Sequence, residues 1–268
     1  MKLTMLGTGN AMVTECYNTC FVLSDNGQDF MVDGGGGNTI LRQLKQAGID
    51  WRNIRDIFVT HKHVDHILGI IWMVRMICQH MQQGQYEGEA NIYGHAEVME
   101  LIEKISRMLL SKKHTKMLGK RLHLIVVSDG ETRVIQGKQV TFFDIQSKKA
   151  KQFGFTMELE DGKKLTCCGD EPYRECEKRY AENSTWLLHE AFCLDAQADL
   201  FHPYEKQHST VKDACEKAEQ LGVKHLVLYH TEDKTIRDRK QRYMEEGKRY
   251  FHGNLYIPDD LEVLELSD

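Results

Sequence analysis

Short apolar runs alternate with polar turns along the first third of the chain. Runs of strand length occupy residues 3–6, 20–23, 30–32 and 56–60, and Asp25-Asn26-Gly27 forms a hairpin-type turn between the second and third. Residues 38–47, which end at Gly48, and the strongly apolar residues 67–82 have the pattern of helices. This alternation of strands and helices is typical of an α/β fold.

The remaining two thirds of the chain continue the alternation. Further strands are predicted at residues 91–93, 122–127, 140–145, 153–159, 164–168, 185–190 and 225–229, with a short strand pair ending at 261–264. Further helices are predicted at 95–110, 171–181, 211–221 and 235–250. There is no internal repeat or low-complexity linker. We therefore expect residues 1–268 to form a single domain of two sheets with outer helices.

The composition is that of an ordinary globular protein. Of 268 residues, 41% are hydrophobic and 28% charged, and the net charge of −5 argues against a generally basic protein that coats nucleic acid. No apolar run reaches 18 residues and the first residues lead directly into a strand pattern, so we expect no membrane span and no export. Eight cysteines without a Cys-x-x-Cys pair suggest reduced thiols in the cytoplasm.

Thirteen histidines are unusually many, and three of them lie in one short loop. The sequence after the strand at 56–60 contains His61, His63, Asp65 and His66. Side chains two residues apart in extended chain point the same way, so His61 and His63 should face one point, and Asp65 and His66 a second one nearby. Imidazole and carboxylate are ligands of zinc, manganese and iron. The loop therefore predicts binding of one or two such metal ions.

The motif Thr-His-x-His-x-Asp-His after a strand resembles that of the metallo-β-lactamase superfamily of metal-dependent hydrolases. Other motifs, in the same order along the chain, resemble the ribonuclease Z branch: residues 6–9 (LGTG), 33–36 (DGGG), 168–170 (CGD), 188–191 (LHEA), 207–210 (QHST) and 228–230 (LYH). The resemblance covers nearly the whole chain. It implies a four-layer αββα sandwich with mixed sheets, a homodimer, and zinc as the metal, with manganese or iron as alternatives.

The resemblance also implies a role for each site residue. By that correspondence, His61 and His63 bind the first metal, Asp65, His66 and His230 bind the second, and Asp170 bridges the two. Asp65, His208 and Glu190 are the implied catalytic residues: Asp65 at the metal, and His208 as the proton donor supported by Glu190. Asp33 is expected to orient a ligating histidine.

The sequence departs from the family pattern at two places. The family has a further metal-binding His a few residues before a Gly-aromatic pair, here Gly154-Phe155, but residues 144–151 contain none. Water, Gln146 or another residue could complete the first site, and Lys148 or Lys149 could place a positive charge there. A one-metal state thus becomes an alternative. Ribonuclease Z enzymes also clamp tRNA with a long arm inserted before the Gly-Asp motif, and residues 140–169 leave no room for one.

The predicted function is metal-dependent hydrolysis. The leading hypothesis is a ribonuclease Z-like phosphodiesterase acting on RNA or a small phosphodiester through a metal-bound hydroxide. Residues 104–121 carry seven Lys and Arg and no acid, which favours a phosphate contact or simply a solvated helix face. The alternatives are hydrolysis of a carboxylic ester, lactone or thioester, and a catalytically weak metal- or nucleic-acid-binding relative.

Overall fold

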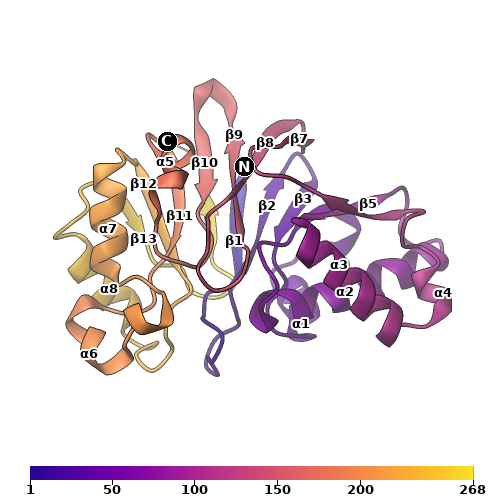
Figure 1. Cartoon of the computed structure of the whole chain (residues 1–268), viewed down its shortest axis with the longest axis horizontal. Helices are drawn as coiled ribbons and strands as arrows, with labels where there is room; N and C mark the ends of the chain where they lie inside the picture. Colours follow the sequence, from indigo (N-terminus) through magenta and orange to yellow (C-terminus); the bar gives the residue numbers. More distant parts are fainter. Residues whose placement is uncertain (268) are drawn as a thin grey trace. The chain divides into compact units, whose positions relative to one another are not determined.

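The computed structural model describes residues 1–267, which fall into two compact units. Unit 1 comprises residues 1–7 and 17–127 together with the segment from Asp260 onward; unit 2 comprises residues 8–16 and 128–259. Each unit contains one seven-stranded sheet (Figure 1). Because each unit is assembled from separated stretches of chain, neither corresponds to a continuous half of the sequence.

The sheet of unit 1 has the order β14-β1-β2-β3-β4-β5-β6. Its strands are β1 (Lys2–Gly7), β2 (Cys20–Asp25), β3 (Gln28–Val32), β4 (Ile54–Phe58), β5 (Ala90–Gly94), β6 (Leu122–Val126) and β14 (Val263–Glu265). The pairs from β14 to β3 are antiparallel and those from β3 to β6 are parallel, so the sheet is mixed. Its helices are α1 (Thr39–Gln46), α2 (Val64–Gln82), α3 (Ala96–Leu109), α4 (Lys112–Thr115) and the 3₁₀ turn η1 (Trp51–Asn53).

The sheet of unit 2 has the order β13-β12-β11-β10-β9-β8-β7. Its strands are β7 (Thr132–Ile135), β8 (Lys138–Asp144), β9 (Phe153–Glu158), β10 (Lys164–Cys167), β11 (Trp186–Glu190), β12 (His225–Tyr229) and β13 (Asn254–Tyr256). This sheet is also antiparallel from β7 to β10 and parallel from β10 to β13. Its helical segments are η2 (Glu160–Gly162), η3 (Glu175–Glu177), α5 (Lys178–Ala181), η4 (Asp195–Gln197), α6 (Ala198–Phe201), η5 (Tyr204–Lys206), α7 (Val211–Gln220) and α8 (Arg239–Gly247).

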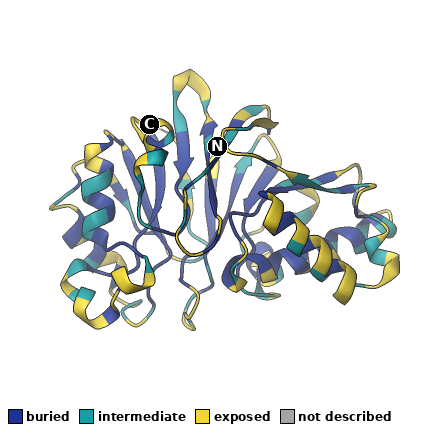
Figure 2. Cartoon of the chain, in the orientation of Figure 1, coloured by how far each residue is buried: buried dark blue, intermediate teal, exposed yellow. Residues whose placement is uncertain are grey.

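Apolar burial between sheet and helices supports each unit. In unit 1, Ile70, Val74 and Ile77 of α2 belong to one buried cluster with Ile57 and Ile92 of the sheet. In unit 2, α7 and α8 contribute to a second cluster with β11 and β12. Figure 2 shows the strands largely buried and the outer faces of the helices exposed. Removal of these apolar side chains from water is the main force that holds each sheet to its helices.

Most predicted elements are confirmed, and the main differences concern the following segments. Residues 171–181 do not form one helix, because Pro172 disfavours helix at the residue before it and helical structure begins only at η3. The helix predicted at 235–250 is shorter, spanning Arg239–Gly247. The last two strands, β13 and β14, belong to different sheets and do not pair. Strand β7 was not predicted, because its sequence TRVI is mostly exposed and lacks an apolar run.

Candidate metal centre

In unit 1, the predicted histidine loop connects β4 to α2. His61 and His63 precede the helix, and Asp65 and His66 lie in its first turn. The backbone at His63 is extended, and Nε2 of His61 lies 2.8 Å from Nδ1 of His63. The expected convergence of these two imidazoles is therefore observed. Nε2 of His66 lies 3.4 Å from Oδ2 of Asp65, and three of the four residues are almost fully buried.

Asp33, directly after β3, holds two of these imidazoles in place. Its Oδ2 lies 2.7 Å from Nδ1 of His66 and accepts a hydrogen bond of 2.8 Å from the Thr60 hydroxyl. Because that hydroxyl donates its proton to Asp33, it accepts from Nδ1 of His61 at 2.9 Å. Both rings are thereby fixed with Nδ1 protonated and Nε2 able to bind a metal. The predicted role of Asp33 agrees with this contact, whereas the role of Thr60 was not foreseen.

Close backbone contact brings α2 against the loop that carries Asp33. The amide of Gly34 donates to the carbonyl of His66 at 2.9 Å, and the amide of Gly69 donates to the carbonyl of Gly35 at 2.9 Å. A Cβ atom on Gly69 would lie 1.7 Å from the Gly34 oxygen. Glycine at positions 34 and 69 is therefore required for the helix to start where His66 contacts Asp33 and His61.

In unit 2, Asp170 follows β10 and His230 follows β12. Gly169 has φ +78°, a conformation that favours glycine, and it turns the chain after the strand so that Asp170 is presented at the strand's end. Nε2 of His230 lies 3.5 Å from Oδ2 of Asp170. The hydroxyl of Tyr229 donates to the Gly169 carbonyl, which fixes this turn from the neighbouring strand end.

The predicted proton-donor pair also lies in unit 2. Glu190, the last residue of β11, is fully buried, and its Oε1 accepts a hydrogen bond of 2.5 Å from the Ser209 amide. Its Oε2 lies 3.6 Å from Nδ1 of His208, beyond ordinary hydrogen-bond distance but close enough for an ion pair. The His208 ring stacks on Phe192 with centroids 5.1 Å apart and lies equally far from the His230 ring.

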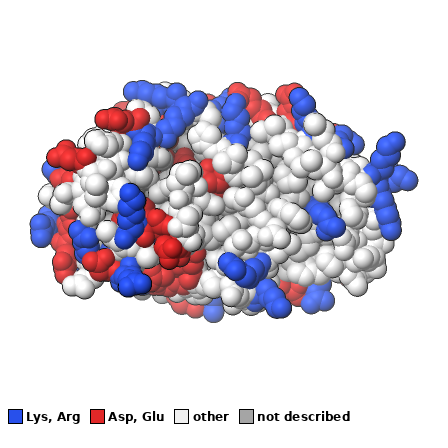
Figure 3. Space-filling view, turned by 90° about the horizontal axis from the view of Figure 1, so that it is seen from below, with Lys and Arg blue, Asp and Glu red and all other residues white. Residues whose placement is uncertain are grey.

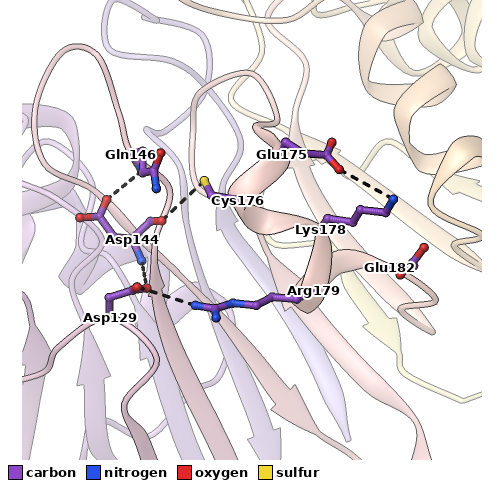
Figure 4. A pocket seen from close by; sticks show the side chains of 8 residues that line it. All are labelled: Asp129, Asp144, Gln146, Glu175, Cys176, Lys178, Arg179 and Glu182. Atoms are coloured by element: carbon purple, nitrogen blue, oxygen red, sulfur yellow. Dashed lines mark hydrogen bonds and ion pairs between the residues drawn. The ribbon is translucent and has the colours of Figure 1, made fainter.

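In the segment between β8 and β9, Gln152, and not the Gln146 considered from the sequence, contacts Asp170. Gln146 has its side chain in a separate cavity of about 480 Å³, lined also by Asp129, Asp144 and Arg179 (Figure 4). The buried Gln152, two residues before Gly154, instead donates from Nε2 to Oδ1 of Asp170 at 2.6 Å. The sequence signal that could have indicated this contact was the position of Gln152, two residues before the Gly-aromatic pair.

Cysteine thiols are poor candidates for this chemistry. Burial raises the pKa of Cys168, two residues before Asp170, well above its ordinary value. The pKa of the Cys193 thiol is raised to about 12 by the same cause. Such thiols stay protonated at neutral pH and are neither nucleophiles nor metal ligands there. The donors available in each unit are imidazole nitrogens and carboxylate oxygens, and these buried His and Asp side chains fit a divalent metal ion.

Solved structures show which fold class the chain has. The metallo-β-lactamase fold protein YhfI from Bacillus subtilis superimposes with a TM-score of 0.76 at 19% identity, covering 98% of this chain and 99% of that one. The short form of human tRNase Z superimposes with a TM-score of 0.75 at 20% identity over the full length of both chains. The predicted fold class is thus confirmed, as two mixed sheets with helices of the metallo-β-lactamase type.

Sequence relatives narrow the class. Ribonuclease Z of Thermococcus sibiricus is 26% identical over 311 aligned residues, covering 100% of this chain and 97% of the relative. The chain is a ribonuclease Z-like, metal-dependent hydrolase of the metallo-β-lactamase superfamily, as the sequence motifs predicted. It belongs to the family described as anti-Pycsar protein Apyc1, whose model matches residues 1–251.

Proposed function

We propose that the histidine and aspartate groups of the two units together form one metal centre. In this proposal, His61, His63 and Asp170 bind one ion, and Asp65, His66, Asp170 and His230 bind the other. The support is that each group follows the carboxyl ends of parallel strands, the edge at which α/β sheets bind ligands. The orientation of His61 and His66 by Asp33 is the observation that carries the proposal, because an outer carboxylate of this kind accompanies ligating histidines.

The proposed activity is hydrolysis of a phosphodiester bond, with zinc as the expected metal and manganese or iron as alternatives. A bound divalent ion supplies Lewis-acid stabilisation of the charge that develops on the phosphoryl group. His208 then donates a proton to the leaving oxygen. Glu190, buried beside it, stabilises the imidazolium form from which the proton is given. Asp65 holds the metal and positions the attacking oxygen.

We favour a small phosphodiester over tRNA as the substrate. In the described chain, β8 and β9 are joined by residues 145–152, and β9 and β10 by residues 159–163, so no arm precedes Asp170. Two arginines of the basic segment at 104–121 also make contacts within unit 1. The Arg121 guanidinium donates to the carbonyls of Tyr86 and Gly88, and Arg107 pairs with Glu103 at 2.7 Å. Figure 3 shows acidic and basic side chains mixed on the visible face.

A substrate panel tests this proposal. Metal-loaded protein should hydrolyse bis(p-nitrophenyl) phosphate, dinucleoside monophosphates or cyclic mononucleotides faster than single-stranded RNA or a tRNA precursor with a 3′ trailer. Preferred cleavage of the tRNA precursor would instead identify RNA as the substrate. If the protein hydrolysed only carboxylic esters, lactones or thioesters, its activity would be that of an acyl hydrolase and not of a phosphodiesterase. Metal binding without turnover of any substrate would indicate a binding protein.

The assembly is also proposed, not observed. We propose that residues 1–268 act as a single domain, since each unit takes in segments from both sides of the other along the chain. A homodimer in the cytoplasm is the arrangement that the family resemblance favours. Among the described helices, none is long and apolar enough to span a bilayer. Light scattering on the purified protein measures the oligomeric state, and a monomer mass would contradict the homodimer.

A further inference from the structure

The segment that lacks the family's histidine is fixed in place within unit 2. We call residues 145–152 the β8–β9 loop. The Ser147 hydroxyl lies 2.6 Å from Oε1 of Glu171, and this hydroxyl accepts from the amides of Lys149 and Ala150 at 3.1 and 3.2 Å. Glu171 is buried and paired with Arg174 at 3.0 Å. The backbone around Lys149 is therefore held, through Ser147, by a carboxylate that directly follows Asp170.

From this fixed backbone, Lys149 reaches the proposed proton donor. Its Nζ lies 3.4 Å from Nε2 of His208. An ammonium group can only donate, so in this arrangement Nε2 accepts and the ring proton is on Nδ1, facing Glu190. Nε2 is the atom from which His208 would protonate a leaving group. The Lys149 ammonium consequently lies beside the place where the substrate's leaving oxygen would be.

We propose that Lys149 is a catalytic residue that binds the phosphoryl group of the substrate. The inference rests on the proposed phosphodiesterase function and deepens it. A dianionic or monoanionic phosphate attracts an ammonium more strongly than a neutral imidazole does, so a bound phosphodiester draws Nζ from His208 to a non-bridging oxygen. Lys149 stays protonated throughout and contributes charge only. Nε2 of His208, once released, takes up a proton from solvent and can then donate it to the leaving oxygen.

The missing histidine explains why a lysine is useful in this loop. With one ligand fewer, the first metal ion would be held less tightly, and its charge would be present near the phosphoryl group less of the time. A lysine beside the proton donor supplies a unit charge without a metal. Gln152 of the same loop hydrogen-bonds Asp170, and Lys149 contacts His208. The β8–β9 loop thus contacts both the metal-binding and the proton-donating residues of unit 2.

The test compares Lys149→Met with Lys148→Met. Both lysines are exposed and both variants lose one positive charge, but within the described residues only the Lys149 ammonium contacts His208. Calorimetric titration of inorganic phosphate into metal-loaded protein should give a Kd that rises roughly tenfold or more in Lys149→Met, the value of one charge-assisted hydrogen bond. Lys148→Met should stay within about twofold of the unaltered protein, and Lys149→Arg should recover part of the affinity. Metal content should be equal in all variants.

Activity provides the second measurement. If Lys149 binds the phosphoryl group, kcat/KM should fall by a similar factor for bis(p-nitrophenyl) phosphate and for a dinucleoside monophosphate. A loss confined to the poor leaving group would overturn phosphoryl binding, because Lys149 would then act only through His208. Equal phosphate affinity in Lys149→Met and Lys148→Met would also overturn it. Failure of the unaltered protein to cleave any phosphodiester would instead reject the proposed function, while the phosphate titration would still decide on Lys149.

Discussion

Single side chains in unit 1 set the tautomer of the imidazoles that we propose as metal ligands. Asp33 accepts from Thr60 and from His66, and Thr60 accepts in turn from His61, so one buried carboxylate determines which ring nitrogen is available on two histidines. Loss of a side chain that hydrogen-bonds a metal ligand typically lowers metal affinity by about 10- to 100-fold. The strength of metal binding should consequently depend on a residue that touches no metal.

Replacement of Asp33 by Asn should weaken metal binding by roughly that 10- to 100-fold factor. The amide has no charge, and if its oxygen takes the place of Oδ2, its NH2 group faces the Thr60 amide, which is also a donor. The contacts that orient His61 and His66 are therefore weakened. Titration with a competing chelator measures the affinity. Asp29→Asn is the matched control, because Asp29 is also buried in unit 1 but contacts Ser24 instead of a histidine. Unchanged affinity in Asp33→Asn would contradict the orienting role.

Replacement of Asp65 or of His208 by Ala should abolish hydrolysis of a phosphodiester with a poor leaving group, for different reasons. Asp65→Ala should lose metal, whereas His208→Ala should keep it and lose the proton donor. Elemental analysis and turnover of a dinucleoside monophosphate distinguish the two variants. An activated p-nitrophenolate leaving group needs little protonation, so His208→Ala should be much less impaired on it. Near-normal turnover of the poor leaving group by His208→Ala would refute its acid role.

At the scale of elements, the segment after Asp170 depends on a buried carboxyl group in η3. Burial raises the pKa of Glu177 to about 8, although its Oε1 accepts from the Arg174 amide at 2.8 Å. The folded protein therefore keeps a proton on Glu177 at pH values where the unfolded chain has released it. With the unfolded pKa at 4.5, this group lowers the free energy of unfolding as pH rises from about 4.5 to 8.

Glu177→Gln should remove this part of the pH dependence. A neutral amide retains the acceptor for Arg174 and has no charge to bury, so the variant should gain stability over the unaltered protein as pH rises through that window. The gain should reach the order of a few kcal/mol above pH 8. Chemical unfolding at pH 5, 7 and 9 measures it. Glu175→Gln, an exposed position of the same turn, is the control, and an equal pH profile in both variants would show that Glu177 is ionised when folded.

At the scale of the whole molecule, we expect the number of bound metal ions to depend on the residue beside Asp170. Gln152 donates to Asp170 and is a weak metal ligand, so the site with His61 and His63 should bind more weakly than the one with Asp65, His66 and His230. Metal titration of the metal-free protein should show two unequal steps or a single one. Two equally tight sites would mean that another residue replaces the missing histidine.

Gln152→His should strengthen the weaker site, because imidazole is a better zinc ligand than an amide. The expected result is a second tightly bound equivalent of metal by elemental analysis. Gln146→His, in the same loop but directed into a separate cavity, should leave the stoichiometry unchanged.

The sequence by itself determined the order of most strands and helices and the identity of the candidate site residues. Apolar periodicity located the central strands and α2, because burial on a sheet imposes a repeat that is visible along the chain. The spacing of His61, His63, Asp65 and His66 was equally local, since one loop and one helical turn place all four. Such local patterns can be interpreted from the sequence because residues close in sequence are also close in space.

Only the tertiary structure decided contacts between distant segments. Hydrogen bonds from Gln152 to Asp170, from Thr60 to Asp33, and between Lys149 and His208 depend on which strand ends lie side by side. Strands β13 and β14 belong to different sheets. Two short apolar strands do not specify in their sequence which strand each will pair with. Local patterns determine which face of a strand is buried, whereas the pairing partner is selected by packing of the whole sheet. The contact between Gln152 and Asp170 became visible only at that level.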